Sequence, residues 1–311
     1  MDHLLSFRMI PTSPILCRRV STSTAAPTTT THFLLPHTRQ PTFRLRILFP
    51  PRHAYCPHRY SVTAAAVGGI GVAAQDAAAA ATVLAGAYGL VFTFDTLTQR
   101  NLIQQNLSRK LVHILSGLIF ALSWPIFSTS TAARYFASLV PMVNCLRLLI
   151  NGLSLGTVDE GLIKSVTREG KPEELLRGPL YYVVVLIVCA LVFWRESPCG
   201  LISLAMMCGG DGVADIIGRR FGSMKIPYNQ HKSWAGSISM FTCGFLISIG
   251  MLYYYSVLGY FQLDWHSTIQ RVALVALVAT MVESLPITRV IDDNLSVPLV
   301  SMIIAYLSFG H

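Results

Sequence analysis

The sequence is poor in charged residues. Only 13% of its 311 residues are Asp, Glu, Lys or Arg, while 52% are hydrophobic and the mean hydropathy is +0.52. Globular domains average about 25% charged residues. This shortage excludes an ordinary soluble domain and predicts a protein whose surface lies largely in lipid.

Three further absences narrow the function. The seven cysteines show no C-x-x-C or C-x-x-H spacing, which excludes a disulfide framework and a zinc site and favours small hydrophobes in a reducing compartment. No G-x-x-x-x-G-K-[S/T] motif occurs, which excludes a Walker A phosphate loop. No internal repeat is present, which argues against a transporter built from two related halves.

Acidic residues are almost missing from the first 62 residues. This segment holds eight arginines, 14 Ser or Thr and half of the prolines, but a single acid, Asp2, and no Lys or Glu. Such a composition is typical of an organellar transit peptide. We therefore predict a transit peptide over residues 1–62 and one functional domain over 63–311, with a retained basic tail as the alternative. Since most of the net charge of +9 lies in this segment, it gives no reason to expect nucleic acid as a partner.

Long apolar runs follow one another from about residue 64 onwards. A transmembrane helix needs about 17–25 such residues. We predict an all-α polytopic bundle of about seven to eight spans, near residues 77–94, 111–127, 132–153, 179–194, 198–217, 234–258, 268–286 and 295–310. The apolar part of the fifth run is short, so this span has to extend into the polar stretch after it.

The charges between the runs are unevenly distributed. If the spans alternate in direction, twelve Lys and Arg fall on one side of the membrane and three, Arg134, Arg195 and Arg271, on the other. The positive-inside rule expects such an imbalance. The more positive face would be the matrix or stromal face of an organelle.

Two acids and two glycines recur at helical spacing in the fifth run. Asp211, Asp215, Gly218 and Gly222 would share one face of a helix. Two carboxylates one turn apart suit Mg²⁺, which takes one or two carboxylates together with substrate phosphates. Close helix packing is the alternative for the glycines, but it does not explain the acids.

The segment that follows is basic. Its Lys232, Ser233 and Gly236 predict a phosphate-binding loop, because glycine lets backbone N–H groups approach and lysine supplies a point charge. A basic loop over anionic lipid headgroups is the alternative.

Arg109, Lys110 and His113 open the second span on the same predicted face. Membrane anchoring would explain the two cations, and a polar contact inside the bundle would explain His113. Arg147, within the third span, is expected to face the interior or a cavity and to hold an anion or a carboxylate.

More acids fall on this face near the end of the chain. Glu283, at the end of the seventh span, is a candidate second metal or hydroxyl partner. We interpret Asp293 and Asn294, before the eighth span, as a helix N-cap.

A family resemblance emerges from these residues. Asp211, Ala214, Gly218 and Gly222, followed after eight residues by His-Lys-Ser-Trp-Ala-Gly (231–236), resemble the CTP-binding signature of the dolichol and polyprenol kinases. That signature has Lys in place of His231 and Glu in place of Ala235. Both departures are similar to the plant phytol and farnesol kinase branch, as are the blocks at 109–113, 173–182, 210–215 and 283–287. The resemblance covers about residues 80–310.

The resemblance implies a multi-pass chloroplast membrane enzyme that phosphorylates phytol from chlorophyll with CTP, towards tocopherol. The envelope is favoured over the thylakoid, with the site on the stromal face. Phytol, CTP and membrane lipids are the expected partners, and no obligate protein partner is indicated. The prenyl tail is expected to stay in the bilayer and to enter between helices.

The residues are assigned accordingly. Asp211 and Asp215 are predicted to hold Mg²⁺, and the residues that carry the chemistry are predicted to be Asp211, Lys232, Lys110, His113 and Glu283, with His113 or Glu283 orienting the alcohol. The residues predicted to contact CTP are Asp211, Ala214, Gly218, Gly222, Lys232, Ser233, Gly236 and Arg109.

Other functions fit parts of the pattern. A farnesol or geranylgeraniol kinase of the same family would share the motifs. A membrane cytidylyltransferase would also need CTP, aspartates and Mg²⁺. A transporter of anions or prenyl lipids could use intramembrane Arg147, but its polar groups would be expected near the bilayer midplane and not at one face.

Overall fold

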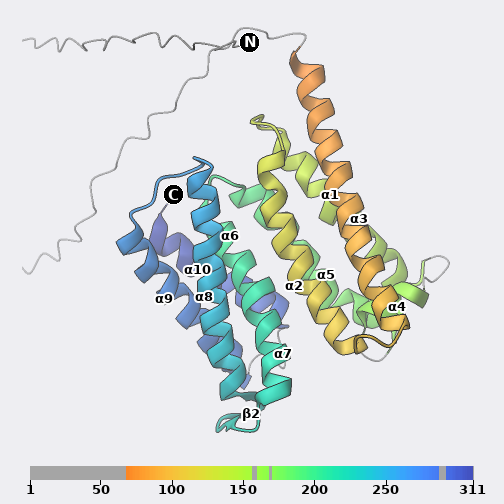
Figure 1. Ribbon diagram of the computed structural model, residues 1–311, viewed down its shortest axis with the longest axis vertical. Helices are drawn as coiled ribbons and strands as arrows, with labels where there is room; N and C mark the ends of the chain where they lie inside the picture. The colour runs from red at the N-terminus through yellow and green to blue at the C-terminus, as the bar shows by residue number, and fades with distance from the viewer. Residues whose placement is uncertain (1–67, 156–159, 168–169, 287–291, 311) are drawn as a thin grey trace, which may run out of the picture. The chain divides into compact units, whose positions relative to one another are not determined.

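The part of the chain that the computed structural model describes is almost entirely helical (Figure 1). It comprises residues 68–155, 160–167, 170–286 and 292–310. The predicted transit peptide, residues 1–62, lies outside these described residues, so it and the boundary at residue 63 stay predictions.

The helices follow one another along the chain with short connections. Their bounds are α1 Gly68–Gln99, α2 Gln105–Ser123, α3 Ala133–Gly152, α4 Glu160–Val166, α5 Gly178–Val188, α6 Pro198–Leu204, α7 Gly212–Phe221, α8 Trp234–Val257, α9 Trp265–Ser284 and α10 Asp293–Phe309. Short 3-10 segments lie at Trp124–Ile126 and Pro172–Leu176, and π-helical segments at Cys189–Phe193 and Ala205–Asp211.

Six of these helical stretches are long and apolar enough to cross a membrane. They are Gly71–Gln99, Ala133–Gly152, Pro172–Phe193, Pro198–Phe221, Trp234–Val257 and Trp265–Ser284. The predicted second and eighth spans also coincide with helices, α2 and α10, but neither belongs to the six, and α10 is shorter. The prediction of an all-α membrane bundle is thus confirmed.

The predicted fifth span is a single helical stretch, as its extension into polar residues required. It runs through α6, the π-helical segment and α7, and 78% of its most apolar window is buried, more than in the other five stretches. Glycines permit this central position. A Cβ at Gly210 would lie 3.4 Å from the Cα of Gly244 on α8, so the two backbones approach closely.

Buried charges fix the turn at the C-terminal end of α2. Asp76 of α1 is fully buried and accepts hydrogen bonds from the backbone N of Ser128 (2.7 Å) and from its hydroxyl (2.8 Å). Arg195 donates to the carbonyls of Trp124 and Phe127 in the same turn. Since the turn itself has few backbone partners, these two charged side chains satisfy its polar groups.

A short β-hairpin connects α7 to α8. Strand β1, Lys225–Ile226, pairs antiparallel with β2, Asn229–Ser233, and Ser233 is the N-cap of α8. Asn229 donates to the carbonyl of Ser284 (3.0 Å), and the hydroxyl of Tyr228 lies 2.8 Å from that of Ser284. The hairpin is therefore fastened to the last turn of α9.

Candidate functional site

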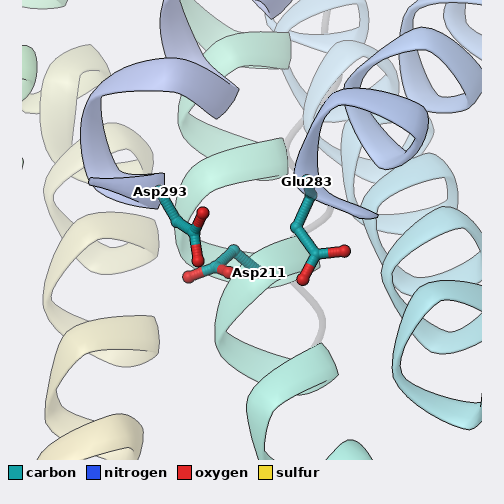
Figure 2. Close-up of side chains that lie close together, drawn as sticks. All are labelled: Asp211, Glu283 and Asp293. Carbon is teal, nitrogen blue, oxygen red and sulfur yellow. The ribbon is translucent and has the colours of Figure 1, made fainter. Parts of the chain in front are cut away.

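Three carboxylates meet where the π-helical segment Ala205–Asp211, α9 and α10 come together (Figure 2). Asp211, Glu283 and Asp293 each offer an oxygen, and these oxygens lie within 4.8 Å of one another. Asp211 and Glu283 are buried, and Asp293 is half-buried. We call these three residues the acid triad. Like charges so close together have to be compensated by cations.

The local backbone structure positions Asp211 and Asp293 for the triad. Asp211 is the last residue of the π-helical segment, a rare conformation that often occurs at functional sites. Asp292, not Asp293, caps α10, because its carboxylate accepts the N–H of Asn294 at 2.9 Å. The interpretation of Asp293 and Asn294 as the N-cap is therefore wrong: the cap lies one residue earlier, and Asp293 is left to join the triad.

Lys232 compensates one side of the triad. Its ammonium forms an ion pair with Glu283 and another with Asp293 at 2.9 Å. Burial by itself would lower the pKa of Lys232, but the charges of Glu283, Asp293 and Asp211 outweigh it and raise this pKa above its ordinary value. Lys232 therefore offers a positive charge to both carboxylates.

Lys110 compensates the other side. Its Nζ lies 3.7 Å from Oδ2 of Asp211 and 3.6 Å from Oδ2 of Asp215, so α2 is joined electrostatically to α7. Asp215 also pairs with Arg219 at 3.0 Å. The structure thus brings Asp211 together with Glu283 and Asp293, and sets Asp215 between two cations outside the triad.

The triad has the composition of a site for a hard cation. Oδ1 of Asp293 is buried, yet it has no hydrogen-bond partner among the described residues. A carboxylate oxygen without a donor is costly to bury. Mg²⁺ prefers such oxygen ligands, so Asp211, Glu283 and Asp293 fit it in ligand type.

His113 lies one helical turn beyond Lys110, near the triad. Its ring packs against that of Tyr182, with 4.2 Å between centroids, and the hydroxyl of Tyr182 donates to the His113 carbonyl at 2.9 Å. Nε2 of His113 is buried and has no hydrogen-bond partner within the part of the chain that the structure describes. The imidazole is therefore held in place by Tyr182, while its Nε2 makes no hydrogen bond with the described residues.

The predicted CTP-contacting glycines lie in the contact between α7 and α8. A Cβ at Gly218 would lie 3.6 Å from the Cα of Gly236, and one at Gly236 would lie 3.3 Å from the carbonyl oxygen of Ala214. A Cβ at Gly222 would overlap the Gly218 carbonyl and the side chain of Ser233. Close packing accounts for these residues, while their predicted contacts with CTP stay predictions.

A cavity of about 1000 Å³ opens beside the triad. Asp211 and Asp293 line it, and so do four cationic side chains, namely Arg109, Lys110, Arg147 and Arg177. His113 lines it as well, whereas Lys232, Ser233 and Glu283 are not among the described residues that do. The cavity therefore offers carboxylates, cations and an imidazole in one space.

Two of these residues, Asp293 and Arg177, were not predicted from the sequence to belong to the site. Asp293 was explained as a cap, and the only signal for another role was its place in a run of two acids. Arg177 was counted as a loop charge and falls within the block 173–182, but it was given no role of its own, although it directly precedes Gly178 and Pro179 at the start of α5. Its position beside the cavity depends on how α5 packs, which no spacing encodes.

The geometry defines a helical membrane protein with an acid and cation site next to a deep cavity. Comparison with known proteins gives the family. The chain is 70% identical over 245 residues to "Probable phytol kinase 1, chloroplastic" of Glycine max, covering 78% of this chain and 81% of that protein. It is 67% identical over 237 residues to "Phytol kinase 1, chloroplastic" of Arabidopsis thaliana, covering 76% and 78%. It is 63% identical over 239 residues to "Probable phytol kinase 1, chloroplastic" of Oryza sativa subsp. japonica, covering 77% and 76%.

The chain belongs to the phytol kinase family. The prediction of a plant kinase that acts on an alcohol is confirmed at this level. The relatives' names and the six long apolar helices together support a chloroplast membrane protein. No family model and no solved structure matches the chain.

Proposed function

We propose that this protein phosphorylates phytol with CTP as the phosphoryl donor and Mg²⁺ as the cofactor. Its product, phytyl phosphate, would serve tocopherol synthesis. The observation that carries the proposal is that two members of the acid triad, Asp211 and Asp293, line one cavity together with the four cations Arg109, Lys110, Arg147 and Arg177. Phosphoryl transfer needs mainly positioning and charge neutralisation, and this set of groups supplies both.

In this proposal the triad binds the metal ion and the cations contact the phosphates. Asp211, Glu283 and Asp293 would hold Mg²⁺, which when bound neutralises charge on the phosphates. Lys110 and Arg109 would contact the phosphates from the cavity wall. Lys232, being paired with Glu283 and Asp293, would position those carboxylates. Its direct contact with the phosphates stays a prediction.

Either His113 or Glu283 was predicted to orient the alcohol. We now favour His113, because it lines the cavity and keeps Nε2 without a partner among the described residues, whereas Glu283 is paired with Lys232. Its imidazole would accept the proton of the hydroxyl group as the phosphate bond forms.

The proposal also covers the membrane in which the protein lies and the face that carries the site. We propose that the site lies on the stromal face, since the loops at this end carry most of the Lys and Arg, and that the envelope is the membrane.

The test uses the full chain in membranes with phytol and CTP labelled at the γ-phosphate. Label in the lipid is the result we expect. Labelled pyrophosphate would instead identify a cytidylyltransferase. Absence of both products, with each nucleoside triphosphate and with farnesol and geranylgeraniol also offered, would overturn the proposal.

A further inference from the structure

The cavity beside the acid triad extends far beyond the charged groups. On α2 its lining runs from Gln105 to Phe120, which by the rise of an α-helix is about 22 Å. Lys110 and Phe120 alone are separated by about 15 Å along this helix. This length exceeds what the reacting groups need.

The charged lining residues are confined to one end of this length. They lie where α2 and α5 begin, whereas the other end is lined by Val83, Phe120, Val140 and Leu186 from four different helices. Each of these four side chains is at most 8% exposed. We call them the floor. A cavity with a reactive end and an apolar floor matches a long molecule with one polar end.

Small residues of α1 form part of the cavity wall. Gly86 lines the cavity, and a Cβ built there would meet no atom within 4 Å. Ala87 is its neighbour in the lining. Gly86 is exposed, so a larger side chain placed there has free space to occupy beside the cavity.

We propose that this apolar part of the cavity binds the isoprenoid chain of the alcohol, and that the floor limits the chain length. The inference rests on the proposed function, because it places the hydroxyl of the alcohol at His113 and the triad. The tail then lies between α1, α2, α3 and α5, within the protein and not loose in the bilayer. Isoprenoid chains carry no hydrogen-bonding groups, so an apolar floor suits them.

The test compares Gly86→Leu with Gly89→Leu. Both glycines lie on exposed parts of α1 and have nothing within 4 Å of a built Cβ, but Gly89 does not line the cavity. The purified variants are offered geraniol, phytol and a six-isoprene alcohol, with kcat/KM measured for each. We expect Gly86→Leu to lower the ratio of phytol to geraniol by about tenfold or more, as misfits in apolar pockets do. Gly89→Leu should leave the ratio unchanged.

Phe120→Ala tests the floor in the opposite direction. Removing the ring should raise the ratio of the six-isoprene alcohol to phytol, whether or not Gly86→Leu folds. If the kcat/KM ratios between the alcohols are unchanged in the folded variants, the inference is overturned. This is the result expected if a membrane lipid, and not the isoprenoid chain, fills the cavity. If the wild-type chain phosphorylates no alcohol, it is the proposed function that fails, so the two failures are distinguishable.

Discussion

The ammonium of Lys232 lies 2.9 Å from Oδ2 of Asp293, a residue 61 positions later in the chain. The lysine comes from the hairpin before α8 and the aspartate from the first turn of α10. Together with the ion pair to Glu283, this contact links the hairpin to two members of the acid triad that are remote from it in sequence.

Replacing Lys232 by Ala should abolish turnover and destabilise the folded protein, because Glu283 and Asp293 would lose their shared cation. Removing one member of a buried ion pair leaves an uncompensated charge. Thermal unfolding of Lys232→Ala, Glu283→Gln and the double variant would measure the coupling, which we expect at about 0.5–3 kcal/mol. If the losses of unfolding free energy in the two single variants add up to that of the double variant, the contact between Lys232 and Glu283 is contradicted.

Asp211→Asn should lower phytol phosphorylation by about 10²-fold or more, since it removes a charge from the centre of the triad. The protein should remain in the membrane at the wild-type level. Asp264→Asn, in an exposed turn before α9, is the matched control and should retain activity. Near-normal turnover of Asp211→Asn would refute the assignment of the site.

Chelation of divalent cations should stop turnover, and titration with Mg²⁺ should restore it. Asp293→Asn should raise the Mg²⁺ concentration for half-maximal activity by at least about tenfold, since even outer-shell partners contribute ~10–100-fold to metal affinity. Asp215→Asn should have a smaller effect on this concentration, because Asp215 is paired with Lys110 and Arg219 outside the triad. A larger effect of Asp215→Asn than of Asp293→Asn on this concentration would favour Asp211 and Asp215 as the ligands.

Gly222→Ala should destabilise the protein by about 1–3 kcal/mol, the usual cost of overpacking. The added methyl group would overlap the Gly218 carbonyl and Ser233. Gly250→Ala, within α8, has free space around the new Cβ and should stabilise by about 0.5–1 kcal/mol. Melting temperatures in detergent would separate the two, and equal values would argue against close packing of α7 and α8.

Asp76→Ala should destabilise the protein by about 1–3 kcal/mol, because it leaves the buried N–H of Ser128 without its acceptor. Turnover per folded molecule should be retained, since Asp76 lies at the end of the bundle away from Lys110. Ser130→Ala, which removes one longer hydrogen bond to Asp76 (3.2 Å), should have a smaller effect. An activity loss without a stability loss in Asp76→Ala would contradict this structural role.

Much of the fold could be predicted because membrane spans follow from local composition. Even the extended fifth span was predictable, since the bilayer sets a minimum length that Pro198 to Gly210 alone cannot reach. Spacing also placed Asp211 and Asp215 on one helix face, where both indeed meet Lys110.

The partners from other helices could not be predicted in this way. Spacing describes neighbours along one helix, whereas Asp293 and Arg177 reach the site through the packing of α10 and α5. The π-helical turn that ends at Asp211 is also invisible to a pattern that assumes regular α-helix. The place of Asp293 in the triad therefore could not be predicted from the sequence, although its acidic side chain was evident there.

The attachment of the hairpin to Ser284 has a mechanical consequence. Ser284 directly follows Glu283, so a shift of α9 along its axis carries Tyr228, Asn229 and with them the strand of Lys232. Backbone anchoring as well as charge thereby sets the register between the ammonium of Lys232 and the carboxylate of Glu283.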